Sequence, residues 1–325
     1  MPRSASKALV DWYRASKRDL PWRGIDDPYA ILVSEVMLQQ TQVATVIPYF
    51  ERFLDRFRTA DSLASATESE CLAEWAGLGY YRRARNLRLA AAVIAESGWP
   101  EDLRSLPGVG EYTAAAIASI AFGRQEACAD GNVRRVMSRL AGETLSIRES
   151  QRASAAMMRG APAREWNQAV MELGALVCTS APDCDECPLR QGCQAYARGL
   201  QAKVPEPIKA TTVQIDHICA CICRGRRVAL REALPGEWWQ GMLVFPHVQV
   251  RGGDCPVGAA KRLGLRVPRV LGTVRHTVTK HRVTLSAYIG HGWPRGLQWH
   301  AIEELQSLPL PAPQKQVARL LEKAA

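Results

Sequence analysis

A tight turn between two helices is the feature that most constrains this chain. Leu106-Pro107-Gly108-Val109-Gly110 is followed, from Thr113, by an alanine-rich apolar run that predicts a helix. The two glycines leave backbone N–H groups uncovered at the positive end of that helix, where phosphate groups bind. Such a turn contacts a nucleic-acid backbone without reading its bases. Taken alone, the pattern fits an ordinary corner between two helices equally well.

The positive charge of the chain lies in its C-terminal part. The net charge is +10, but residues 1–200 hold 24 basic and 24 acidic side chains, whereas residues 201–325 hold 18 basic and 8 acidic ones. A basic region of this kind suits a polyanionic partner. The balanced part still contains a local mixture of tyrosine and arginine over residues 80–88. Such a mixture contacts phosphates and wedges between bases, although a solvated helix face has the same composition.

Two kinds of periodicity divide the chain. Up to about residue 200 the pattern predicts amphipathic helices over 28–42, 43–56, 69–77, 82–97, 113–122, 133–141, 149–158 and 165–177. Two prolines within 203–209 then interrupt the pattern, and strand-like runs follow over 213–218, 227–230, 242–245 and 283–289. We therefore expect an all-α domain over 1–200, a linker over 201–212 and a smaller α+β domain over 213–325.

The sequence also limits where the protein works and which side chains do its chemistry. It shows no membrane-spanning run, and its start lacks the apolar core of a secretory signal, so we expect a cytoplasmic protein. All six histidines lie beyond residue 200. Chemistry in the N-terminal part therefore cannot use histidine.

Four of the ten cysteines form a cluster within residues 178–193. Their order is Cys178-x5-Cys184-x2-Cys187-x5-Cys193, and close thiolates in a cytosolic protein indicate a metal site rather than disulfides. Zinc usually takes two CxxC pairs, whereas unequal gaps around a single CxxC, with Pro188 after the third ligand, favour an iron–sulfur cluster. Zinc remains the alternative on spacing alone.

Two carboxylates stand out in the helical part. Glu35 is the one acid in the otherwise uncharged run Val33–Gln42, where desolvation would raise its pKa towards that of a proton donor. Asp130 precedes Gly131-Asn132-Val133 at a helix start, twenty residues beyond Gly110. Each has an ordinary explanation, Glu35 as a surface charge and Asp130 as a helix cap. Together with the turn and the cysteines they form one pattern.

With these residues in place, the chain resembles the MutY family of adenine DNA glycosylases, within the helix-hairpin-helix and iron–sulfur glycosylase superfamily. The resemblance covers nearly the whole chain. It rests on Leu20–Arg23, Ser34–Val43, Gly77–Leu87, the Leu106–Gly110 turn, Asp130–Val133 and the four cysteines. The Glu35 and Tyr80 motifs separate this family from its relatives better than the shared turn does.

The resemblance implies removal of adenine mispaired with 8-oxoguanine or guanine, after the base flips out of the duplex. Neutral Glu35 would donate a proton to N7 of adenine, and ionised Asp130 would stabilise the cationic sugar, directly or through a covalent adduct. Tyr112 occupies the position where lyase relatives carry a lysine, so we expect base removal without strand cleavage. Tyr112 would hydrogen-bond a carboxylate, and Asn132 would orient the water or Asp130.

The resemblance also assigns binding roles. The residues that would line the adenine pocket are Arg18, Trp22, Arg23 and Gln168. Those that would wedge the duplex or seat phosphate are Gln40, Tyr80, Leu106, Gly108 and Gly110. The cysteines would hold one [4Fe-4S] cluster, although their first gap is one residue shorter than the family's usual six. The partner would be double-stranded DNA in a bacterial nucleoid, bound by a monomer.

The C-terminal part resembles the Nudix-related domain that senses 8-oxoguanine, through Pro235–Pro246 and residues 299–311. Gly258–Gly264 lacks the acids of the Nudix metal box, so we do not expect pyrophosphate hydrolysis. Where the family commonly has Phe-Ser-His, this chain has Val278-Thr279-Lys280. Thr279 would keep the hydroxyl contact to the lesion, but the aromatic wedge is lost. Two alternatives remain: a lesion-binding protein without catalysis, and an endonuclease III-like lyase.

Overall fold

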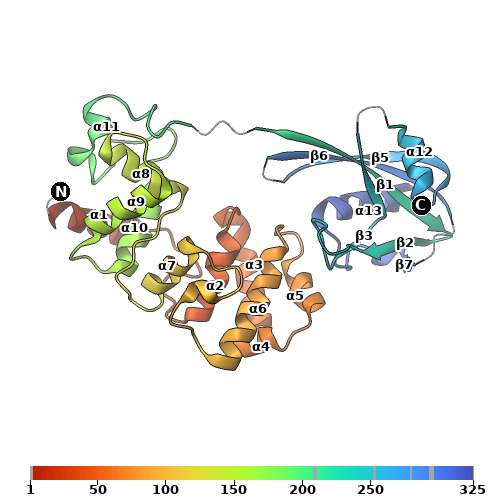
Figure 1. Cartoon of the computed structure of the whole chain (residues 1–325), viewed down its shortest axis with the longest axis horizontal. Coiled ribbons are helices and arrows are strands. Elements are labelled where there is room, and N and C mark those ends of the chain that lie inside the picture. Colours follow the sequence, from red (N-terminus) through yellow and green to blue (C-terminus); the bar gives the residue numbers. More distant parts are fainter. Residues whose placement is uncertain (1–2, 208–210, 252–253, 279, 293–295, 325) are drawn as a thin grey trace. The chain divides into compact units, whose positions relative to one another are not determined.

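The computed structural model describes residues 3–207, 211–251, 254–278, 280–292 and 296–324. Helices form the N-terminal part and a mixed sheet forms the C-terminal part (Figure 1). The chain divides into two compact units. One holds residues up to Ser65 and those from Asn86 to the end of the helical part, and the other holds Ala66–Arg85 with the C-terminal part. Every described helix is too short or too polar to span a bilayer.

The helical part confirms the predicted all-α class. Its elements are α1 (Arg3–Ser16), α2 (Pro28–Leu38), α3 (Val43–Arg56), α4 (Ala60–Ala64), α5 (Glu68–Trp75), α6 (Arg82–Ser97), η1 (Leu103–Ser105), α7 (Glu111–Ile120), α8 (Gly131–Ala141), α9 (Ile147–Met158), α10 (Ala163–Leu176), η2 (Arg190–Gly192) and α11 (Gln194–Ala197). Helix α10 packs against α1, α7 and α8. Its apolar face, with Trp166 and Leu173, is part of a core that α1 and α8 complete.

Helix α2 shows why one predicted boundary was wrong. Asp27 caps its start by accepting a hydrogen bond from Tyr29 N at 2.9 Å, and the residues from Tyr29 to Met37 are buried. The helix ends at Leu38, although its apolar pattern predicts an end at Gln42. Gln39 has left the helical conformation, and Gln40 takes a left-handed φ of 56°. Residues 39–41 are therefore a turn at the end of a buried helix.

A buried amide fixes the segment that enters α8. Asn167 of α10 donates to Ser119 Oγ at 2.8 Å and to Glu126 O at 2.7 Å, and it accepts from Cys128 N at 3.2 Å. A buried amide with its hydrogen bonds satisfied holds a segment more rigidly than apolar packing alone. The chain just before Asp130 is thereby tied to α7 and α10.

The C-terminal part is a mixed sheet, as the α+β class requires. Its elements are β1 (Val213–Arg224), β2 (Arg227–Glu232), β3 (Leu243–Val244), β4 (His247–Val250), α12 (Pro256–Arg262), β5 (Arg266–Val278), β6 (His281–His291), β7 (Gln298–Ala301), η3 (Ile302–Glu304) and α13 (Ala312–Ala324). The main path runs β3-β2-β1-β6-β5, with β4 on β1 and β7 on β2. Strands β1 and β6 are parallel, and the other pairs are antiparallel.

The two faces of the sheet bury different side chains. Ile218 and Ala220 of β1 join α12 in one apolar cluster. Cys219, on the other face, lies near Gln314 of α13, whose side chain also accepts a hydrogen bond from Phe245 N at 3.2 Å. The long strand β5 was not predicted, because it is exposed along much of its length and has no clear alternation of buried residues.

Part of the predicted linker lies against the helical part. Val204 is buried, and its carbonyl accepts from Arg139 Nε at 2.9 Å. Glu206 N donates to Thr144 Oγ1 at 2.9 Å. Residues 204–206 thus belong structurally to the helices.

Candidate active site

A cavity of about 710 Å³ opens between α2, α7 and α10. This size is typical of pockets that enclose a small-molecule group such as a nucleobase. The predicted site residues that line it are Arg18, Trp22, Arg23, Glu35, Gln40, Gly108, Gly110, Tyr112, Asp130, Asn132 and Gln168. The fold therefore brings together residues that are up to 150 positions apart in the sequence.

Glu35 lies in the buried helix α2 with only 7% of its surface exposed. Burial raises the pKa of this carboxyl from 4.5 to about 7, a hydrogen bond from Tyr112 lowers it, and the negative charge of Asp130 raises it. A carboxyl with a pKa near neutrality is matched to proton donation at physiological pH.

Asp130 occupies the opposite kind of environment. It caps α8, accepting from Val133 N at 2.7 Å and from Asn132 Nδ2 at 3.0 Å. These donors and the positive end of the helix all stabilise a negatively charged carboxylate. Of the two roles predicted for Asn132, its geometry favours orienting Asp130. Asn132 is itself held by Arg135 Nη2 at 2.7 Å.

Tyr112 lies at the start of α7, between the two acids and α10. Burial raises the pKa of its phenol well above 10, and the charges of Glu35 and Asp130 raise it further. The hydroxyl therefore stays protonated; it donates to Met171 Sδ at 3.2 Å and lies close enough to Glu35 to lower the pKa of that carboxyl. Among the described residues, no lysine lines the cavity.

The glycine turn forms one edge of the same cavity. Gly108 has a φ of 79°, and a Cβ there would lie 2.7 Å from Cβ of Asn86. Gly110 is the N-cap of α7 and has no side chain, so no side-chain hydrogen bond caps the first N–H groups of that helix. Leu106 is buried beneath the turn and does not line the cavity.

Sequence reasoning missed Glu172 of α10. Arg18 and Arg23, both predicted for the pocket, converge on this buried carboxylate. Burial raises the pKa of Glu172, but the hydrogen bonds from Arg18 and Arg23 lower it to about 2. Helix α10 also carries Arg164 and Glu165, so Glu172 did not stand out as the one acid of an uncharged helix, as Glu35 does.

The remaining pocket residues have local partners. Trp22 lies edge-on to Phe50 at 5.4 Å between ring centroids. Gln168 accepts from Tyr13 Oη at 2.9 Å and donates to Arg164 O at 3.2 Å. Gln40 lines the cavity from the turn after α2, in a conformation that is strained for a residue other than glycine.

Comparison with known proteins agrees with this geometry. Residues 33–159 match the HhH-GPD superfamily of base excision DNA repair proteins, and residues 217–320 match the NUDIX domain. Curated adenine DNA glycosylases are similar to this chain. That of Mycolicibacterium smegmatis is 41% identical over 219 residues, covering 63% of this chain and 73% of the relative. That of Buchnera aphidicola from Schizaphis graminum is 36% identical over 261 residues, covering 76% and 75%.

The chain belongs to the adenine DNA glycosylase family. The mouse (Mus musculus) adenine DNA glycosylase is 40% identical over 262 residues, covering 74% of this chain. This chain spans about half the length of such mammalian relatives. Among solved structures, a thermostable thymine-DNA glycosylase matches with a TM-score of 0.56 and 27% identity, covering 59% of this chain and 95% of that one. A trapped endonuclease III–DNA covalent intermediate matches with a TM-score of 0.51 and 25% identity, covering 61% and 96%.

The family's four cysteine positions lie together beyond α10. The pKa of Cys187 is raised to about 11, mainly by burial and also by the nearby thiols of Cys178, Cys193 and Cys184, so all four cysteines are neighbours. Arg139 Nη1 lies 3.3 Å from Cys178 Sγ, and Cys193 Sγ donates to Arg139 O at 3.3 Å. In the part of the chain that is described, no three His, Cys, Asp or Glu side chains are arranged to hold a single metal ion.

Tyr80, like Leu106, is a predicted DNA contact that does not line this cavity. Tyr80 belongs to the compact unit that contains Ala66–Arg85 and takes a left-handed φ of 51°, as Gln40 does in the other unit. Thr279 lies outside the described residues.

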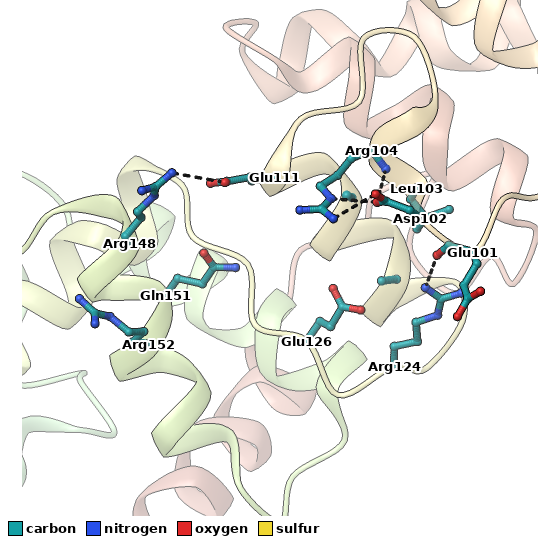
Figure 2. Close-up of a pocket in the computed structure, with 12 residues that line it drawn as sticks. Glu101, Asp102, Leu103, Arg104, Glu111, Arg124, Glu126, Arg148, Gln151 and Arg152 are labelled. Atoms are coloured by element: carbon teal, nitrogen blue, oxygen red, sulfur yellow. Dashed lines mark hydrogen bonds and ion pairs between the residues drawn. The ribbon is translucent and has the colours of Figure 1, made fainter.

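A larger cavity, of about 1050 Å³, lies beside η1, α7 and α9 (Figure 2). Two ion pairs lie among the charged residues of its lining. Arg104 Nε contacts Asp102 at 2.8 Å, and Arg148 Nη2 contacts Glu111 at 3.5 Å. The predicted catalytic residues are absent from its lining, so its size alone does not make it the active site.

Proposed function

We propose that this chain is a monofunctional DNA glycosylase that removes adenine mispaired with 8-oxoguanine or guanine. The observation that carries this proposal is the pair of carboxylates in one cavity with opposite environments. Burial favours the neutral form of Glu35, whereas Asp130 caps a helix N-terminus and accepts hydrogen bonds from two donors. A proton donor and an anion on either side of one bond are the requirements of glycosidic hydrolysis.

In the proposed reaction, Glu35 donates its proton to N7 of the flipped adenine as the bond between N9 and C1′ breaks. The bonding electron pair leaves with the base, and Asp130 stabilises the positive charge that remains on the sugar. Water then adds to C1′, and its proton returns the Glu35 carboxylate to the neutral acid. Asn132 holds Asp130, and Tyr112 holds Glu35. Cleavage of the strand would need an amine nucleophile, and Tyr112 lacks one.

A second experiment tests whether the rate of adenine excision depends on the base opposite the adenine, and whether the C-terminal part sets that preference. Excision rates are compared for adenine opposite 8-oxoguanine, guanine and thymine, with the wild type and with Thr279→Ala. Thr277→Ala is the matched control, because it lies two residues away on β5 and is exposed. We expect the order 8-oxoguanine, guanine, thymine, and a loss of the preference for 8-oxoguanine over guanine in Thr279→Ala alone. Equal rates opposite all three bases would refute the assignment of mispaired adenine as substrate.

We also propose that Cys178, Cys184, Cys187 and Cys193 hold a [4Fe-4S] cluster. The donor set is four neighbouring thiols, and four cysteine thiolates are the ligand set of [4Fe-4S] clusters. When bound, the cluster would fix the loop that follows α10 and take no part in the chemistry at C1′. Iron and sulfide analysis of brown protein supports this assignment, whereas colourless protein loaded with zinc contradicts it.

A further inference from the structure

Glu172 binds both pocket arginines at once. Oε1 accepts from Arg18 N at 2.8 Å, from Arg18 Nε at 3.0 Å and from Arg23 Nη1 at 2.9 Å. Oε2 accepts from Arg18 Nη2 at 2.6 Å and from Arg23 Nη2 at 2.7 Å. One carboxylate therefore receives five hydrogen bonds, with each guanidinium bound through two nitrogens. Bidentate pairs of this kind fix orientation as well as charge.

Burying the charged carboxylate of Glu172 costs free energy, which suggests that the arrangement has a role in the site. The Glu172 side chain is 1% exposed, so its charge is removed from water and must be matched by the arginines. The two arginines exceed the one acid by a single positive charge, and all three residues line the cavity. A buried ion pair contributes little to stability compared with apolar packing, whereas it specifies geometry well.

The two arginines differ in the donors that they have left. Arg23 Nη1 donates both to Glu172 and to Arg18 O, at 2.8 Å for the latter, and its guanidinium lies over the Tyr13 ring at 5.4 Å. Its side chain is 11% exposed. Arg18 is 35% exposed, and its Nη1 has no hydrogen-bond partner among the described residues. Arg18 is therefore the arginine whose Nη1 group can donate hydrogen bonds to a ligand.

We propose that Glu172 is a positioning residue that directs Nη1 of Arg18 towards a ring nitrogen of the flipped base, while Arg23 supports Glu172 and makes no base contact. This inference rests on the proposed function, because it takes the cavity to be the adenine pocket. It changes the predicted roles of the two arginines, which the sequence treats alike. Adenine offers N1 and N3 as acceptors besides N7, which the proposed reaction assigns to Glu35.

The test uses single-turnover excision of adenine, 1-deazaadenine and 3-deazaadenine by the full chain. Each analogue deletes one acceptor nitrogen and keeps N7. For the wild type, one of the two analogues is expected to lose about tenfold or more in rate relative to adenine, because a hydrogen bond from a charged donor is lost. Glu172→Gln should lower the rate on adenine itself by about tenfold to a hundredfold through misplacement of Arg18.

The decisive readout is the analogue penalty in the variant. In Glu172→Gln the penalty should fall to within about threefold of no effect, because the contact is already lost. Dividing each analogue rate by the adenine rate of the same variant, and comparing variants, removes the intrinsic reactivity of the analogues. Arg18→Met should show the same loss of penalty, and it provides the test if Glu172→Gln does not fold. The double variant should be no slower than Arg18→Met.

Glu165→Gln is the matched control. Glu165 also lies on α10 and binds an arginine through two nitrogens, Arg14 Nε at 3.2 Å and Nη2 at 2.6 Å, but it does not line the cavity. Its removal should leave the rate and the analogue penalty unchanged. If a general role in joining α1 to α10 explained Glu172, both variants would slow excision and both would keep the penalty.

Three results would overturn the inference: a wild type indifferent to both analogues, a Glu172→Gln variant that keeps the full penalty, or additive effects of Arg18→Met and Glu172→Gln. Failure of the proposed function is a separate outcome, since the wild type would then release no adenine from any duplex.

Discussion

Replacing Glu35 by glutamine separates catalysis from stability. The amide keeps the size of the carboxyl but has no acidic proton to donate. We expect the single-turnover rate of adenine release to fall by about a hundredfold to ten-thousandfold, the usual range for losing a general acid. The variant should bind duplex DNA as well as the wild type, because the substitution does not alter the turn at Gly108 and Gly110 that we propose to seat phosphate.

The raised pKa gives the pH dependence of the wild type. With a pKa of about 7, half of the Glu35 carboxyls are protonated at pH 7. About one in a hundred remains protonated at pH 9, so the rate should be level below pH 6 and fall about tenfold per unit above pH 7. With the ordinary pKa of 4.5, the fall would already begin near pH 5.

The same shift predicts that Glu35→Gln is more stable than the wild type. Because the folded pKa is raised, the folded state binds more protons than the unfolded state between pH 4.5 and about 7, so stability is lost as pH rises through this window. The shift of about 2.5 units corresponds to about 3 kcal/mol at pH 8. Urea unfolding at pH 8 should show the glutamine variant stabilised by a few kcal/mol, with little difference at pH 4.5.

Both measurements are needed. An active glutamine variant would refute Glu35 as the proton donor. An inactive variant with no gain in stability at pH 8 would refute burial as the cause of its raised pKa.

Three further predictions use other residues. Asp130→Asn keeps a good helix cap, so the melting temperature should change little while adenine release falls at least about a hundredfold. Gly108→Ala should cost about 1–2 kcal/mol through its φ of 79°, and more through the clash with Asn86; Gly123→Ala, which has a φ of 64° and no neighbour, isolates the first cost in thermal melts. Burial lowers the pKa of His217 to about 4, so stability should fall as pH drops from 6.5 towards 4, and His217→Phe should reduce that loss in urea titrations.

Local signals in the sequence predicted much of the helical part. Helix α6, over Arg82–Ser97, begins and ends where its amphipathic pattern does. Helix α2 does not, because Gln39–Thr41 continue an acceptable helical pattern while the backbone turns at Gln40 to line the cavity. Strain at a site residue is a tertiary effect that no local pattern carries.

The residues of the candidate site also fall into two groups, those with a local signal in the sequence and those without one. Glu35 and Asp130 were found because an acid in an apolar helix and an acid before a helix start are local features. Glu172 was missed because its role depends on hydrogen bonds with two arginines about 150 residues away in the sequence. The histidine and tryptophan rings that gather around His217, including His247 and Trp238, come from separate strands and a loop, and no single run of sequence shows them together.

The central claim is that the cavity between Glu35 and Asp130 removes adenine without cutting the strand. The direct measurement incubates the purified chain with a duplex that carries adenine opposite 8-oxoguanine, assays free adenine by chromatography and analyses the strand before and after alkali. We predict stoichiometric release of adenine, an intact strand before alkali and a cut strand after it. Strand cleavage without alkali, accompanied by a borohydride-trapped protein–DNA adduct, would contradict the account, and so would tight binding without any release of base.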